Sequence, residues 1–187
     1  RFTVLQNGNL IATNGGILEL NVGTYTAHPS LSHIKAEDNS EIQLNSCTIE
    51  GGSFEVDNLD FTLNNNIVRT VNNSTLKGTD NEALLIVDNT RTLSFVGDDI
   101  TNLGLIIPDG TTSATNLFFS DASDSTITLG GTGGILLDNA FDGITGSINH
   151  TLVHNSPHSI EGGGELGRGQ ISFLNHSAVT ANHAIPL

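Results

Sequence analysis

Hydrophobic and polar residues alternate in short runs along this chain, and the stretch 41–56 shows the pattern most clearly. In EIQLNSCTIEGGSFEV, the alternation is interrupted first at Asn45-Ser46 and then at Gly51-Gly52. A period of two places every second side chain on the same side of a β-strand. Asn and Gly tolerate the positive φ angles of tight turns. The stretch therefore predicts three short strands joined by corners rather than by long hairpins.

A four-residue motif recurs along the chain and consists of an apolar residue, any residue, an apolar residue and then Asn or Asp. The last positions of its copies, including looser ones, are Asn21, Asn45, Asn64, Asp88, Asp109, Gly130, Asn155 and Asn175. Consecutive copies lie roughly 22 residues apart, a period that is typical of a solenoid in which each repeat forms one turn. We therefore predict an all-β, single-stranded parallel β-helix of about eight turns, with the Asn and Asp anchors at structural corners.

Glycine pairs precede several of the alternating runs, as in 15–21, 51–57 and 133–138, and indicate recurring corners. No segment has the periodicity of a helix. The segments 22–39 and 109–124 lack clean alternation and are expected to be loops. Inward-pointing corner Asn side chains would bond the backbone of the turns above and below. We predict that residues 1–187 form a single β-solenoid domain, one module of a longer array or fibre.

Composition agrees with many turns around a thin core, because 36% of the residues are hydrophobic, 21 are Gly and 21 are Asn. The net charge is −14 with only six Lys and Arg residues, so we expect no nucleic-acid partner. No apolar run approaches the roughly 20 residues that span a bilayer, and we expect no membrane insertion by this segment. The single cysteine, Cys47, lies at an inward position and is expected to be a small buried residue.

Two stretches near the ends of the chain have distinctive sequences. They comprise NLIATNGGILEL (9–20) with IKA (34–36) and EIQLNSCTIEGGSF (41–54), and IEGGGELGRGQISFLN (160–175) with 179–182 and 185–187. With a less distinctive middle, 121–138, they resemble the long repeats of very large bacterial surface proteins, which are adhesin-like and have β-helical passengers like those of autotransporters. The resemblance implies an extracellular or cell-surface structural or adhesive role without catalytic residues, in which Leu187 of one module leads into the Arg1 strand of the next.

One acidic pair, Asp98-Asp99, is similar to the paired aspartates of β-helical polysaccharide hydrolases such as polygalacturonases. There, one carboxylate protonates the glycosidic oxygen and others activate water. The Gly-His-Gly and Arg-x-Lys motifs that accompany such pairs do not occur in this sequence. We therefore expect a solvated turn and no enzyme. The alternative is a carbohydrate-active β-helix, either a polysaccharide-cleaving enzyme or a phage tail-fibre-type glycan binder, with its ligand along one lateral face.

Histidine and acidic clusters are the other candidates for chemistry. The histidines of the C-terminal part are His150, His154, His158, His176 and His183. Pro157 and the surrounding β pattern argue against a helix that would align the first three, so surface histidines are expected rather than a metal site. The acidic groups at 57–60, 98–99 and 121–124 lack the nonapeptide spacing of calcium β-rolls. We predict no cofactor and no metal.

The ends of a solenoid are its natural contact surfaces. Unless a cap covers it, the last turn at each end exposes unpaired strand edges that template further strands. Neither end of this sequence shows a helical or charged cap. We therefore predict that the chain stacks end to end with itself or with neighbouring modules, with surface glycans as a further class of partner.

Overall fold

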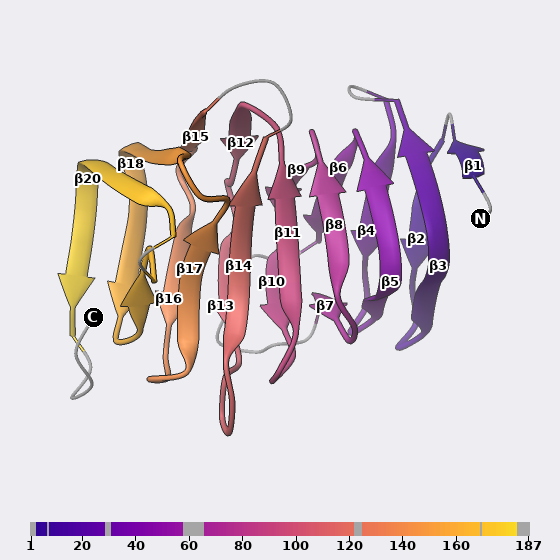
Figure 1. The fold of residues 1–187 in the computed structure, drawn as a ribbon. Coiled ribbons are helices and arrows are strands. Elements are labelled where there is room, and N and C mark those ends of the chain that lie inside the picture. The colour runs from indigo at the N-terminus through magenta and orange to yellow at the C-terminus, as the bar shows by residue number, and fades with distance from the viewer. Residues whose placement is uncertain are drawn as a thin grey trace.

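A computed structural model describes residues 3–6, 8–28, 31–57, 66–121, 125–168 and 170–182. Their regular elements are all β-strands, and every recorded strand pair is parallel. Successive strands stack along one axis, from β1 at one end to β20 at the other (Figure 1). The predicted all-β, single-stranded parallel β-helix is confirmed.

The elements share short lengths, since each turn of the coil is divided among several strands. In chain order they are β1 (Thr3–Gln6), β2 (Leu10–Ala12), β3 (Ile17–Ala27), β4 (His33–Ala36), β5 (Glu41–Glu50), β6 (Ser53–Val56), β7 (Ile67–Thr70), β8 (Ser74–Lys77), β9 (Asp80–Glu82), β10 (Leu84–Val87), β11 (Thr92–Val96), β12 (Asp99–Thr101), β13 (Leu105–Pro108), β14 (Thr115–Ser120), β15 (Thr126–Gly130), β16 (Gly134–Leu137), β17 (Asp142–Gly146), β18 (Thr151–Gly162), β19 (Glu165–Leu166) and β20 (Ser172–Ala181).

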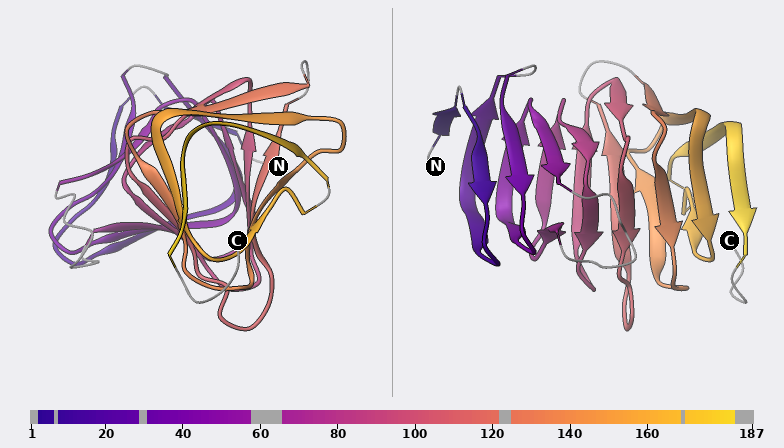
Figure 2. Two further views of the ribbon diagram at one scale, coloured as in Figure 1. Left: turned by 90° about the vertical axis from the view of Figure 1, so that its left-hand side faces the viewer. Right: turned by 180° about the vertical axis from the view of Figure 1, so that it is seen from behind.

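The strands form three faces, which enclose a common interior when viewed along the axis (Figure 2). Face A stacks the first part of β3, the first part of β5, β7, β10, β13, β16 and the second parts of β18 and β20. Face B stacks β1, the second parts of β3 and β5, β8, β11, β14, β17 and β19. Face C stacks β2, β4, β6, β9, β12, β15 and the first parts of β18 and β20. The longest strands therefore bend across two faces.

The repeat length varies from turn to turn. On face A, Leu85 pairs with Val68, a short step along the sequence, whereas Leu105 pairs with the much more distant Gly134. The predicted period of roughly 22 residues lies between these two steps, and the predicted count of about eight turns is close to the observed stack. The strands of successive turns stay in register, and the differences in repeat length fall in the corners. This is possible because only the strands must form hydrogen bonds with the neighbouring turn.

The core consists of columns of inward side chains that repeat from turn to turn. On face B, paired positions place Ile49, Leu76, Phe95 and Phe119 in one column, and none of the four is more than 3% exposed. The rings of Phe95 and Phe119 stack with centroids 5.0 Å apart. Cys47 also points inward, and burial raises the pKa of its thiol, as expected for a small buried residue.

The two segments predicted as loops contain strands. β3 continues through Ala27 and β4 lies at His33–Ala36, both inside 22–39, while β14 lies inside 109–124. The loop prediction is therefore wrong for these parts. Each of these strands is hydrogen-bonded to a strand of a neighbouring turn, and such pairing stabilises Thr-rich segments whose own alternation is weak.

Candidate functional site

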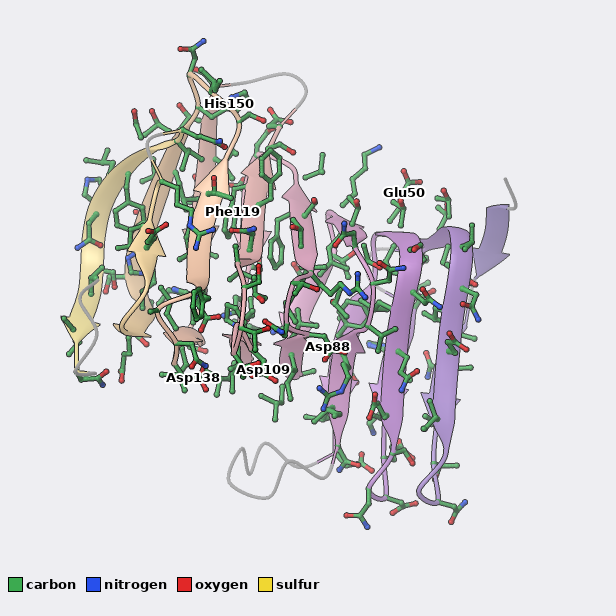
Figure 3. The ribbon with its side chains drawn as sticks, turned by 60° about the horizontal axis from the view of Figure 1, so that its bottom comes forward. Glu50, Asp88, Asp109, Phe119, Asp138 and His150 are labelled. Carbon is green, nitrogen blue, oxygen red and sulfur yellow. The ribbon has the colours of Figure 1, made fainter. Side chains whose placement is uncertain are left out.

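The predicted Asn and Asp anchors lie at the boundaries between faces. Asn21 and Asn45 pair within β3 and β5, and Asn45 precedes Ser46, whose φ of 56° turns β5 from face A to face B. Asp88 and Asp109 directly follow β10 and β13 at the same boundary, together with Asp138 after β16 (Figure 3). The remaining anchors are Asn155 and Asn175, which lie where β18 and β20 turn from face C to face A, and Asn64, which lies outside the described residues. The predicted series of anchors thus combines residues from two different corners, the one between faces A and B and the one between faces C and A.

The anchors of the first corner make bonds on the surface. The Asn45 side-chain nitrogen donates to Asn21 Oδ1 and to Glu19 Oε1, both at 2.8 Å. Asn21 is exposed and Asn45 half-buried. These residues therefore link neighbouring turns from outside the core and do not form the predicted inward ladder.

A buried polar column lies instead at the corner between faces C and A. It consists of Asn81, Asn102, His158, His154 and Asn175, and we call it the polar column. The first four side chains are at most 1% exposed, and Asn175 is the exposed end of the column. The prediction that His154 and His158 are surface histidines is therefore wrong. Period-two alternation was the available signal, because His154 shares its side of β18 with the buried Leu152.

The other described histidines of the C-terminal part, His150 and His176, lie apart from this column. His176 is exposed on β20, as predicted, and His150 is half-buried in the corner before β18. His183 lies outside the described residues. Of the four described histidines in this set, two thus enter the core, and both lie on β18.

Hydrogen bonds run along the polar column in one direction. Asn81 Nδ2 donates to Asn102 Oδ1 at 2.8 Å, and Asn102 Nδ2 lies 2.9 Å from His158 Nε2. Since an amide nitrogen only donates, His158 Nε2 accepts, and its proton is on Nδ1. That Nδ1 is 3.0 Å from His154 Nε2, and His154 Nδ1 is 2.7 Å from Asn175 Oδ1. The same reasoning therefore makes both histidines neutral Nδ1–H tautomers.

Burial favours the uncharged form of both rings. Burial, together with the charge of the neighbouring His154, lowers the pKa of His158 to about 4. Burial also lowers the pKa of His154, although the bond to Asn175 opposes this shift. At neutral pH the column is thus an uncharged chain of satisfied donors and acceptors, which starts inside the apolar core and ends at the exposed Asn175.

One carboxyl group, that of Asp142, is fully buried near the face A to face B corner. Its Oδ1 accepts from Gly110 N at 2.8 Å and its Oδ2 from Asn139 N at 3.0 Å, so the side chain joins the loops after β13 and β16. Burial raises the pKa of this carboxyl to about 7, the two N–H donors oppose the shift, and the charge of Asp138 adds to it. Asp142 thus joins two loops, but its ionised form destabilises the folded state.

This raised pKa predicts that Asp142 weakens the fold at high pH. Because its pKa in the folded state lies above the ordinary 3.8, its contribution to stability is full below about pH 4 and is lost as the pH rises through 7. We expect the difference in unfolding free energy between wild type and Asp142→Asn to favour wild type by about 2 kcal/mol more at pH 5 than at pH 8. Denaturant titrations at both pH values measure it, with the exposed Asp99→Asn as control. A difference that does not change with pH would contradict this prediction.

The two ends of the solenoid present open strand edges. We call β19 with β20 the C-terminal rung, and β1, β2 and residues 17–20 of β3 the N-terminal rung. Among the described strands, each rung pairs only toward the middle of the molecule. Inward side chains there are only partly covered, namely Leu10 and Leu18 at one end and Leu166, Phe173 and Val179 at the other. Within the described ranges, both ends thus leave apolar core layers incompletely closed.

An acidic groove lies at the corner between faces B and C. Its lining includes Glu50, Lys77, Asp98, Asp99 and Asp121, and it is an open depression with a volume of about 670 Å³. The structure thus brings Asp98-Asp99 close to Asp121 and Glu50, which come from other turns; Figure 3 labels Glu50 on this edge. Asp98 and Asp99 are exposed and lack the desolvated environment of a glycosidase's general acid.

The acidic groups considered for calcium are only partly described. Residues 58–60 of the first group and 122–124 of the third lie outside the described residues. Within the described ranges, no group of three or more His, Cys, Asp or Glu side chains is placed to hold a metal ion.

Ser53, His33 and Glu55 meet on face C without forming a catalytic triad. His33 Nδ1 lies 3.0 Å from Ser53 Oγ and also contacts Glu55 Oε1. A triad needs the serine on one ring nitrogen and the carboxylate on the other. Since both partners share Nδ1, the carboxylate cannot orient the ring for proton transfer from the serine.

Comparisons with protein-family models, with curated proteins and with solved structures found no match for this chain. In the part of the chain that the structure describes, no helix is long and apolar enough to cross a membrane. The function is therefore inferred from the chain's own residues.

Proposed function

We propose that this chain is a structural or adhesive module of an extracellular or cell-surface fibre, which stacks end to end with copies of itself or with neighbouring modules and has no catalytic role. The observation that carries the proposal is the pair of open rungs, each with a partly exposed apolar layer. The resemblance of the two terminal stretches to repeats of bacterial surface proteins supports the extracellular location.

The direction of the strands selects head-to-tail stacking. Strands on each face are parallel to their neighbours, so the N-terminal rung of one copy continues the parallel ladder at the C-terminal rung of another. Two like ends would instead meet with opposed strand directions. Head-to-tail contacts use different surfaces on the two partners, and such contacts generate filaments when the rotation does not close a ring.

The side chains of the two rungs match face by face. On face C the inward residue of the C-terminal rung is Phe173, and that of the N-terminal rung is Leu10; on face A the corresponding residues are Val179 and Leu18. Each stacked pair would remove apolar surface from water in the same way as the columns inside the solenoid, at roughly 25 cal/mol per Å². The junction would thus repeat the internal packing.

The edge of β20 also lacks the devices that prevent strand pairing. Natural edge strands carry Lys, Pro or inward charges, and none of these occurs in SFLNHSAVTA. Its outward Leu174 is 47% exposed, and Ile17 at the opposite rung is 64% exposed. Both rungs are therefore suited to pairing with another chain rather than to preventing such pairing.

The test is the assembly state of the purified chain as a function of concentration, measured by sedimentation velocity and electron microscopy. We expect filaments with a strand repeat near 4.8 Å along the axis. Val179→Lys should abolish them, because it places a charge in the apolar layer of the docking end. Thr180→Lys is the matched control, since Thr180 is exposed on the same strand. A wild type that stays monomeric, or a Val179→Lys variant that assembles normally, would refute the proposal.

A carbohydrate-binding role is the second candidate, and the acidic groove favours it. Its open lateral position and its carboxylates, which can accept hydrogen bonds from sugar hydroxyls, suit a glycan. Binding or cleavage on a glycan array that disappears in Asp98→Asn and Asp99→Asn would establish this role. An array without signal would leave end-to-end stacking as the single proposal.

A further inference from the structure

The histidine pair of the polar column contacts the C-terminal rung directly. His154 Nδ1 donates to Asn175 Oδ1, and the Phe173 ring stacks on the His154 ring with centroids 5.9 Å apart. Ser177 Oγ donates to the backbone oxygen of His158 at 2.5 Å. Three residues of β20 thus contact this pair, so that the state of the pair affects the β20 part of the rung.

Among the residues that the structure describes, no charged side chain lies where it would stabilise a protonated ring. Around the pair, the corner after β12 presents the neutral Asn102, β15 presents Leu129, and β20 presents Phe173 and Asn175. The nearest charged or titratable side chains on these strands are Asp99, Glu161 and His176, and all three are exposed. Among the described residues, the titratable group that faces each buried histidine is therefore the other histidine.

A proton added to either ring breaks the chain of hydrogen bonds. On His158 it would occupy Nε2, which then could not accept from Asn102 Nδ2. On His154 it would occupy Nε2 and remove the acceptor for His158 Nδ1–H. Either change sets two donors against each other inside an apolar core, where an unsatisfied polar group is costly. Departure of β20 would relieve the conflict, because it exposes this end of the column to water.

We propose that the His154–His158 pair is a proton-operated latch that keeps the C-terminal rung closed at neutral pH and releases it in acid. The opened rung exposes histidines with ordinary pKa values near 6.5, whereas burial lowers those values in the closed rung. Protons therefore bind the open form more tightly, and opening increases as the pH falls below about 6.5. As a consequence that rests on the proposed stacking function, end-to-end assembly would be lost in acid.

The experiment measures hydrogen exchange of the amides in 172–181 and in the central strands β5 and β8, at pH 7.5 and 4.5, corrected for intrinsic exchange rates. We expect the opening constant of β20 to rise by roughly 10- to 100-fold in acid, while β5 and β8 change much less. The double variant His154→Gln/His158→Gln should lose this response. The control variant His176→Gln replaces an exposed histidine of β20 itself and should keep the response to acid.

Other outcomes separate the latch from stacking. If β20 opens in acid but no filaments form at any pH, the latch stands and the stacking function fails. Filaments that dissolve in acid in wild type but not in the double variant support both. Opening that does not depend on pH overturns the latch. Should the double variant fail to fold, nitrogen NMR of wild type at pH 7 decides, because the latch requires Nδ1–H tautomers for both rings, and an Nε2–H tautomer for either overturns it.

Discussion

Replacing Asn102 with alanine is expected to lower the free energy of unfolding by about 3 kcal/mol. The side chain is fully buried and makes three hydrogen bonds, to Asn81, Gly134 and His158. Its removal leaves His158 Nε2 without its donor and creates a small polar void where the surrounding backbone is closely packed. Urea denaturation followed by circular dichroism measures the change.

Asn45→Ala is the matched control for Asn102→Ala. Asn45 also donates two side-chain bonds between turns, but they lie at the surface, where water replaces them. We expect a loss below about 0.5 kcal/mol. Equal losses in the two variants would show that the polar column stabilises the fold no more than the surface bonds of Asn45, and would contradict the prediction for Asn102→Ala.

Phe119→Ala is expected to cost about 4 kcal/mol, since it removes a fully buried ring and leaves a cavity beside Phe95. The columns of a thin solenoid core have few other atoms to fill such a space. Figure 3 labels Phe119 on β14. Thermal and denaturant unfolding both report the loss.

The neighbouring Phe118 provides the control, because it is the same residue type on the outward side of the same strand and is only half-buried. Phe118→Ala should cost less than about 1 kcal/mol. A larger loss for Phe118 than for Phe119 would mean that β14 faces the opposite way, and would overturn the register of face B with β11 and β17.

The polar column also has a structural consequence that apolar columns lack. Ile, Leu, Val and Phe stack in many registers with similar energy, whereas the amide and imidazole groups are satisfied only when Asn81, Asn102 and His158 meet in one arrangement. Buried polar groups specify register in other repetitive folds. We infer that this column aligns the middle and C-terminal turns at one corner.

The amino-acid sequence by itself determined the class of fold. Short alternating runs such as 41–50, interrupted again and again by Asn or Gly, allow strands and corners but no helix. The inward position of Cys47 followed from the same alternation, because the period of a strand is local and does not depend on distant residues. These features depend only on residues that are close to one another in the sequence.

Tertiary structure alone decided which corners stack and which polar residues are buried. Because the repeat length changes from turn to turn, the sequence spacing could not show that Asn45 and Asn155 belong to different corners or that Asn81 meets Asn102. The strands at 24–27 and 115–120 likewise depend on hydrogen bonds from other turns. Alternation along β18 placed His154 on the inward side, but only residues of other turns, Asn102 and Asn175, supply the hydrogen bonds that allow the two rings to be buried.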